Sequence, residues 1–229
     1  MKKTKVIIPA LGLLLLSTAA SVTGTVAWFA ANNTVSATGM TISAKSNTEF
    51  LVIVEGNSFI NTAVTTTVTS TASATSLYPV APKNTLAANN VNTPATWQYA
   101  YSNNVASYAA ATGYTDCTAQ NFGDYVASET FSLGLNVNSG LDTSATHLSL
   151  KSVNVPDDTG ISCVVVCGNV FGNYTADSSV ELDLGVNATT SGTVVTVYYY
   201  INGEDTNVYS SNSTNLTGEI TLNFGFVEA

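Results

Sequence analysis

The residue types that carry out enzyme chemistry are scarce in this chain of 229 residues, and they form no recognisable catalytic set. His147 is the single histidine, and no His-Glu-x-x-His pattern exists in which it could bind zinc. Asp158-Thr159-Gly160 spells the active-site triplet of aspartic proteases, but those enzymes need two facing copies and the chain holds one. Because Pro156 and Asp157 precede it, we interpret the triplet as a turn. The chain is therefore predicted not to be an enzyme, with no cofactor and no bound metal.

Two pairs of carboxylates need a separate interpretation. Glu181 with Asp183, and Glu204 with Asp205, have the composition of a glycosidase pair or a calcium site. Solubilising charge on an exposed strand and in a turn explains the same residues more simply. The chain also has no Gly-x-Ser-x-Gly elbow and no glycine-rich phosphate loop.

The sequence leaves two interpretations of the three cysteines open, one with a disulfide and one without. Cys163 and Cys167 are four residues apart on a predicted strand, or about 13 Å, too far for a mutual disulfide. Cys117 is free to pair with either of them in an oxidising compartment. Three buried, unpaired thiols are the alternative.

The N-terminus has the layout of an export signal. Lys2, Lys3 and Lys5 precede an apolar run, and small residues lead to Thr25 and Ala27. Cleavage after Ala27 makes residues 1–27 the signal peptide and Trp28 the first mature residue. A retained membrane anchor is the alternative, since the weakly apolar run to Ala31 just reaches the length of a bilayer span.

Charge supports an extracellular location and excludes one class of partner. Beyond residue 27 the chain has three lysines and no arginine against fifteen acidic residues, a net charge of −12. Such a chain repels phosphate backbones, so we expect no nucleic-acid partner. We predict a secreted, acidic cell-surface protein that meets the membrane only through its signal segment.

Hydrophobic residues at every second position predict strands along most of the mature chain. The segments 131–137, 180–186 and 220–226 each have one apolar face. Both faces of 194–201 are apolar or aromatic, which places that strand centrally or under a covering loop. Turn signals such as Asn202-Gly203 separate these segments. We predict an all-β fold, a single antiparallel β-sandwich over residues 28–229.

Residues 71–120 are predicted to form a long, loop-rich insertion with one short strand over 96–101. Trp97, Tyr99 and Tyr101 share a face of that strand. Because loops carry function disproportionately, this face is the ligand platform under an alternative hypothesis, a monomeric adhesin or carbohydrate-binding module.

The segment after the signal is predicted to be a strand with a bulge. Val35 and Ala37 alternate in one phase, Gly39 interrupts, and Met40 and Ile42 continue in the opposite phase. Trp28 and Phe29 precede it, and two large aromatic side chains at a chain end must be buried somewhere. They fold back into their own domain or insert into a neighbouring copy.

Residues 24–45, GTVAWFAANNTVSATGMTISAK, resemble the signal junction and first strand of the TasA and camelysin group of exported proteins from Gram-positive bacteria. Thr48–Ile53 and Val197–Asp205 resemble recurring segments of such proteins more loosely. The resemblance implies cleavage at Ala27 by a dedicated export signal peptidase. It also implies a jelly-roll-like β-sandwich and a homo-oligomeric filament of the extracellular or biofilm matrix, in which each subunit donates its N-terminal strand. Some members are classed as metallopeptidases, a reading that the single His147 disfavours.

Overall fold

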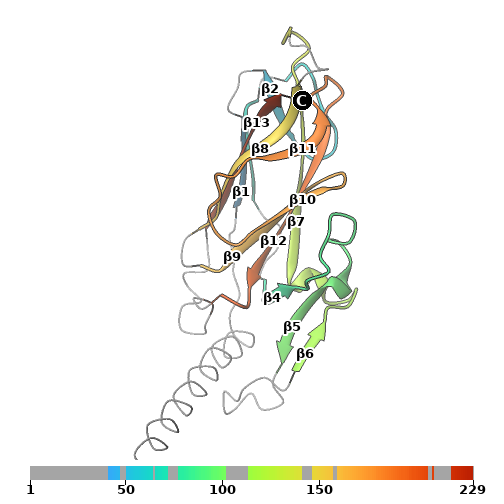
Figure 1. The fold of residues 1–229 in the computed structure, drawn as a ribbon, viewed down its shortest axis with the longest axis vertical. Coiled ribbons are helices and arrows are strands. Elements are labelled where there is room, and N and C mark those ends of the chain that lie inside the picture. The colour runs from blue at the N-terminus through green and yellow to red at the C-terminus, as the bar shows by residue number, and fades with distance from the viewer. Residues whose placement is uncertain are drawn as a thin grey trace, which may run out of the picture.

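The computed structural model describes residues 41–46, 50–63, 65–71, 77–101, 113–140, 146–156, 159–205, 208 and 218–228. Within these ranges the chain consists of strands and two one-turn 3₁₀ helices, η1 (Pro94–Thr96) and η2 (Phe122–Asp124). Figure 1 shows this arrangement. The prediction of an all-β fold is confirmed.

The first sheet joins both ends of the described chain. Its spatial order is β11 (Leu182–Asn187), β8 (Thr146–Asn154), β13 (Glu219–Glu228), β1 (Thr41–Ser46) and β3 (Thr67–Thr71). β1 runs parallel to β13, with Ile42 opposite Ile220, and antiparallel to β3. A purely antiparallel sheet was predicted, and this pair corrects the prediction. β1 and β13 lie at opposite ends of the sequence, so no tight turn forces them to run in opposite directions.

The second sheet is built around β12. From one edge it contains β10 (Val170–Tyr174), β9 (Ile161–Cys167), β12 (Thr193–Asn202), β7 (Val126–Leu135) and β2 (Leu51–Glu55). At Ile201 and Asn202, β12 pairs in parallel with β4 (Pro79–Pro82), which leads to β5 (Trp97–Tyr101) and β6 (Gly113–Asp116). The predicted central position of 194–201 is confirmed, since β12 pairs with β9, β7 and β4.

One hydrophobic cluster draws side chains from both sheets. Fully buried members include Ile42 of β1, Leu222 of β13, Leu133 of β7 and Val197 of β12. Alternate residues along these strands enter the cluster, as the period of two predicts. Two predicted core positions are wrong: β7 ends at Leu135 and β11 begins at Leu182, which leaves Val137 and Val180 exposed by 52% and 76%.

A bulge in β8 explains why the sequence did not reveal that strand. Phe224 of β13 is opposite Leu150, but Asn223 is opposite Ser152, so Lys151 is an extra residue. Leu150 and Val153 therefore both enter the core although three positions separate them. A bulged strand breaks the period of two that a sequence search relies on.

The predicted insertion at 71–120 contains more regular structure than expected. β5 matches the predicted strand, and β4 and β6 extend it into a small sheet at the lower end of Figure 1. This small sheet covers the lower part of the outer face of β12. A second hydrophobic cluster forms there, in which Val80, Trp97, Val164 and Tyr200 are fully buried.

Candidate functional site

The assembly strand predicted from the sequence falls partly within the described residues. Of its residues, Ile42 lies in β1, where its side chain is fully buried. The other predicted assembly residues, Trp28, Phe29, Val35, Ala37, Gly39 and Met40, lie outside the described residues, as do Thr25 and Ala27 of the cleavage site.

β1 makes contacts on every side. Its backbone pairs with β13 along one edge and with β3 along the other, and Ala44 is as fully buried as Ile42. On its outer face the Ser43 hydroxyl lies 2.9 Å from the Thr69 hydroxyl of β3. The Thr41 N–H donates to the carbonyl of Gly218 at 3.2 Å, which joins the start of β1 to the start of β13. β1 is thus an interior strand of the first sheet, and its loss would separate β3 from β13.

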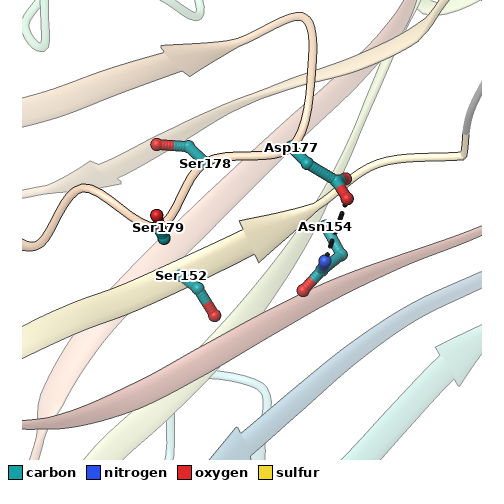
Figure 2. Close-up of a pocket in the computed structure, with 5 residues that line it drawn as sticks. All are labelled: Ser152, Asn154, Asp177, Ser178 and Ser179. Carbon is teal, nitrogen blue, oxygen red and sulfur yellow. Dashed lines mark hydrogen bonds between the residues drawn. The ribbon is translucent and has the colours of Figure 1, made fainter.

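A polar hollow of about 370 Å³ lies at the first sheet, where the β10–β11 connection runs beside β8. Ser152, Asn154, Asp177, Ser178 and Ser179 line it (Figure 2). The Asp177 carboxylate accepts the Val155 N–H at 2.7 Å and the Asn154 side-chain amide at 3.1 Å. Ser178 exchanges two backbone hydrogen bonds with Val153, each 2.8 Å long.

These bonds give the hollow a structural explanation. Both oxygens of Asp177 accept hydrogen bonds, and the Ser178 hydroxyl accepts the Val180 N–H at 3.3 Å. Among its lining residues there is no histidine, cysteine or cation. The arrangement fastens the β10–β11 connection to β8, and it supplies neither a nucleophile with a base nor a cation for an anionic ligand.

The single histidine and one of the carboxylate pairs meet across β8 and β11. His147 Nδ1 lies 3.0 Å from Asp183 Oδ2, and the Lys151 ammonium forms an ion pair with Glu181. The hydrogen bond with His147 holds the pKa of Asp183 below its ordinary value, and the bond from Lys151 does the same for Glu181. Because both carboxylates are exposed, these contacts are those of a solvated sheet face.

The three residues of the predicted aromatic platform differ in their surroundings. Trp97 is fully buried, its ring packs edge-on against Tyr200 at 4.9 Å, and its indole N–H donates to the Val91 carbonyl at 2.8 Å. Tyr99 is partly buried and stacks on Tyr125 with ring centroids 4.7 Å apart. Tyr101 ends β5. Trp97 therefore offers no ring face at the surface, because the small sheet folds its aromatic side towards β12.

The cysteines are unpaired and buried, the second of the two readings left open by the sequence. Cys163 lies in the main core and Cys117 in the smaller cluster, on opposite faces of the second sheet. Burial raises the pKa of Cys163 to about 12 and that of Cys167 to about 11. Burial, with Asp116 adding to it, raises the pKa of Cys117 to about 12. All three are thiols at neutral pH and poor nucleophiles.

Neither a cluster of potential metal ligands nor a membrane-spanning helix occurs in the part of the chain that the structure describes. No three histidine, cysteine, aspartate or glutamate side chains gather there in a way that could hold a metal ion. No helix there is both long and apolar enough to cross a bilayer.

Comparisons with known proteins return nothing. No protein-family model, no curated protein and no solved structure matches this chain. The described part of the predicted assembly strand is β1, which lies between β13 and β3.

Proposed function

We propose that this protein is a secreted structural subunit of an extracellular fibre or surface matrix, assembled through its N-terminal strand. The domain would be a jelly-roll-like sandwich of the two sheets. The observation that carries the proposal is the position of β1, the first described strand, between β13 and the edge strand β3 of the first sheet, with Ile42 and Ala44 fully buried. When β1 is exchanged between two copies, it makes the same contacts in the neighbour that it makes within its own copy. The exchange therefore costs little free energy.

The direction in which β1 runs gives further support. β1 runs parallel to β13, so the chain enters the first sheet at the end where β13 begins. The C-terminal end of β13 lies at the opposite end of that sheet (Figure 1). The N-terminal segment that precedes β1 contains Trp28 and Phe29. A contact from one end of a subunit to the other end of the next is head-to-tail, and such contacts generate filaments.

The test is negative-stain electron microscopy of the mature protein that begins at Trp28, with N-terminal sequencing of the exported chain to verify cleavage after Ala27. The informative variant is the double substitution Trp28→Ser and Phe29→Ser, which leaves β1 intact. We expect filaments from the parent and none from this variant, at an unchanged melting temperature. Phe50→Ser, which removes an aromatic ring exposed by 43%, is the matched control. A monomeric parent, or filaments from the double variant, would contradict the proposal.

A carbohydrate-binding module is the second candidate, favoured by exposed rings on the small sheet. Tyr78 and Tyr114 are exposed by 39% and 53%, and Tyr78 lies 6.1 Å from Tyr125 between ring centroids. Aromatic rings of this kind stack on sugars. A glycan array probed with the parent and with Tyr78→Ala tests this candidate: binding that Tyr78→Ala removes supports it, and a blank array rejects it.

A further inference from the structure

The outer face of the second sheet has an uncharged strip that the described chain covers only in part. In β12 the side chains of Val195, Val197 and Tyr199 enter the core, so Val194, Thr196 and Tyr198 face outward. The register places Thr196 beside Val166 of β9, which in turn lies beside Phe171 of β10. We define the β12 strip as these outward residues: Phe171, Val166, Val194, Thr196 and Tyr198. Phe171 and Val194 are exposed by 36% and 43%.

Two parts of the chain lie at the borders of the strip on the same face of the sheet. On one side the Ser132 hydroxyl donates to the Gly56 carbonyl at 2.8 Å, and the Phe59 ring that follows covers Gly134 of β7. At the lower end the small sheet buries Tyr200 and Val164. Figure 1 shows β9, β10 and β12 side by side above that small sheet. The chain thus covers both flanks of this face. Between them Val166 and Tyr198 pack partly against the second cluster, and Phe171 and Val194 stay exposed.

The two outer faces of the molecule differ in charge. The first sheet presents His147, Lys151, Glu181 and Asp183, the mixed charges of a solvated face. The β12 strip contains no ionisable group other than the Tyr198 phenol, whose pKa burial raises. The whole chain has a net charge of −9. Two copies repel each other wherever acidic faces meet, and the strip is a surface on which they meet without that repulsion.

The sheet edge beside the strip points to the same partner. β10 is an edge strand whose sequence, Val-Phe-Gly-Asn-Tyr, contains neither a charge nor a proline. Other described edges are protected: β2 ends in Glu55, and β11 contains Asp183 and an irregular register. β3 is uncharged too, but its side chains are mostly hydroxyls. Among the described edges, only β10 combines an uncharged sequence with an exposed aromatic ring.

We propose that the β12 strip binds the β12 strip of a second copy, as a side-by-side contact between subunits. A two-fold contact of this kind is self-complementary, so one apolar patch serves both partners. It goes beyond the proposed function, because it needs no N-terminal strand and joins molecules laterally.

The test is sedimentation velocity of the mature chain over a concentration series, with Phe171→Glu and Val194→Glu as variants and Val180→Glu as the matched control. Val180 is exposed by 76% and lies outside the strip. We expect a dimer from the parent and from Val180→Glu. Each strip variant is expected to weaken the dimer at least ~10-fold, because symmetry brings two like charges together. Far-ultraviolet circular dichroism verifies folding, and either strip variant suffices if the other misfolds.

Three results would overturn the proposal: a parent that stays monomeric at every concentration, a control as weak as the strip variants, or strip variants that dimerise like the parent. Electron microscopy separates it from the fibre proposal. If only the fibre proposal fails, filaments are absent and the dimer remains. If only the strip contact fails, filaments form and Phe171→Glu leaves their bundling unchanged. The parent protein could instead stay monomeric and bind phosphatidylcholine vesicles, with Phe171→Glu abolishing that binding. This result would assign the strip to a membrane and reject the second copy.

Discussion

At the scale of single residues, several close contacts in this protein depend on glycine. Gly192 has a φ of +75°, and a Cβ there would overlap the Phe59 ring. At Gly134 an added Cβ would lie 2.6 Å from the Thr189 carbonyl oxygen and 2.7 Å from Phe59 Cζ. The 56–63 loop reaches the outer face of β7 because these two positions lack side chains.

We predict that Gly192→Ala destabilises the protein by ~2–4 kcal/mol, since it combines left-handed backbone strain with a steric overlap. Gly140→Ala is the matched control. Gly140 has a φ of +66° with nothing within 4 Å of an added Cβ, so only the backbone strain of ~1 kcal/mol remains. Urea unfolding of both variants measures the difference. Equal losses would show that Phe59 does not occupy this position.

A second residue-scale prediction concerns the thiols. Because burial raises the pKa of Cys163 to about 12, the thiolate that reacts with iodoacetamide is scarce at pH 8. We expect no alkylation of Cys163 in the folded protein over hours, and alkylation of all three cysteines in denaturant. Mass spectrometry of the labelled protein measures both. Rapid labelling of the folded protein would be incompatible with the buried position.

At the scale of elements, the Asp177 side chain helps to hold the β10–β11 connection to β8, together with the backbone bonds between Ser178 and Val153. Asp177 accepts the Val155 N–H and the Asn154 amide. We predict that Asp177→Ala lowers the free energy of unfolding by ~1–3 kcal/mol, because the Val155 N–H loses its partner. Asp177→Asn retains an oxygen that can accept this N–H, so it is expected to lose less than half as much. Denaturant unfolding checks the ranking, and an Asn variant as unstable as the Ala variant would contradict it.

The ends of the predicted strands offer a further element-scale test. Leu222 of β13 is fully buried, whereas Val180 lies just before β11 and is largely exposed. We expect Leu222→Ala to cost ~2–5 kcal/mol and Val180→Ala to stay within ~0.5 kcal/mol of the parent. Thermal and urea unfolding would distinguish them. Similar costs would place Val180 in the core, as its sequence pattern suggested.

At the scale of the whole molecule, the acidic side chains are expected to link stability to pH. The pKa of Asp183 is held below its ordinary value of 3.8 by His147, and that of Glu181 below 4.5 by Lys151. A lowered carboxyl pKa stabilises the folded state above the unfolded pKa, and this stabilisation is lost as the pH falls through the folded pKa. The melting temperature should therefore fall between about pH 5 and pH 2. Asp183→Asn should make this dependence shallower, which thermal melts across the pH range would show.

How much of the fold was predictable depends on the strand. Phe131, Leu133 and Leu135 alternate cleanly, and the structure buries all three. β8 was not predicted, because the bulge at Lys151 breaks its period. β4 and β6 have four residues each, too few for a pattern to emerge. At the aromatic platform, alternation correctly put Trp97 and Tyr99 on one face, but no local pattern says which way that face turns.

By itself, the sequence determined the all-β class, the central place of β12 and the scarcity of catalytic residues, because alternation and residue type are local properties of the chain. Only the tertiary structure decided that β1 lies parallel to β13, that Trp97 is interior and that Phe171 and Val194 remain exposed on the outer face of the second sheet. These outcomes depend on contacts between segments far apart in the chain. Pairing direction and burial are set by which distant strand arrives alongside, and the residues of one strand do not contain that information.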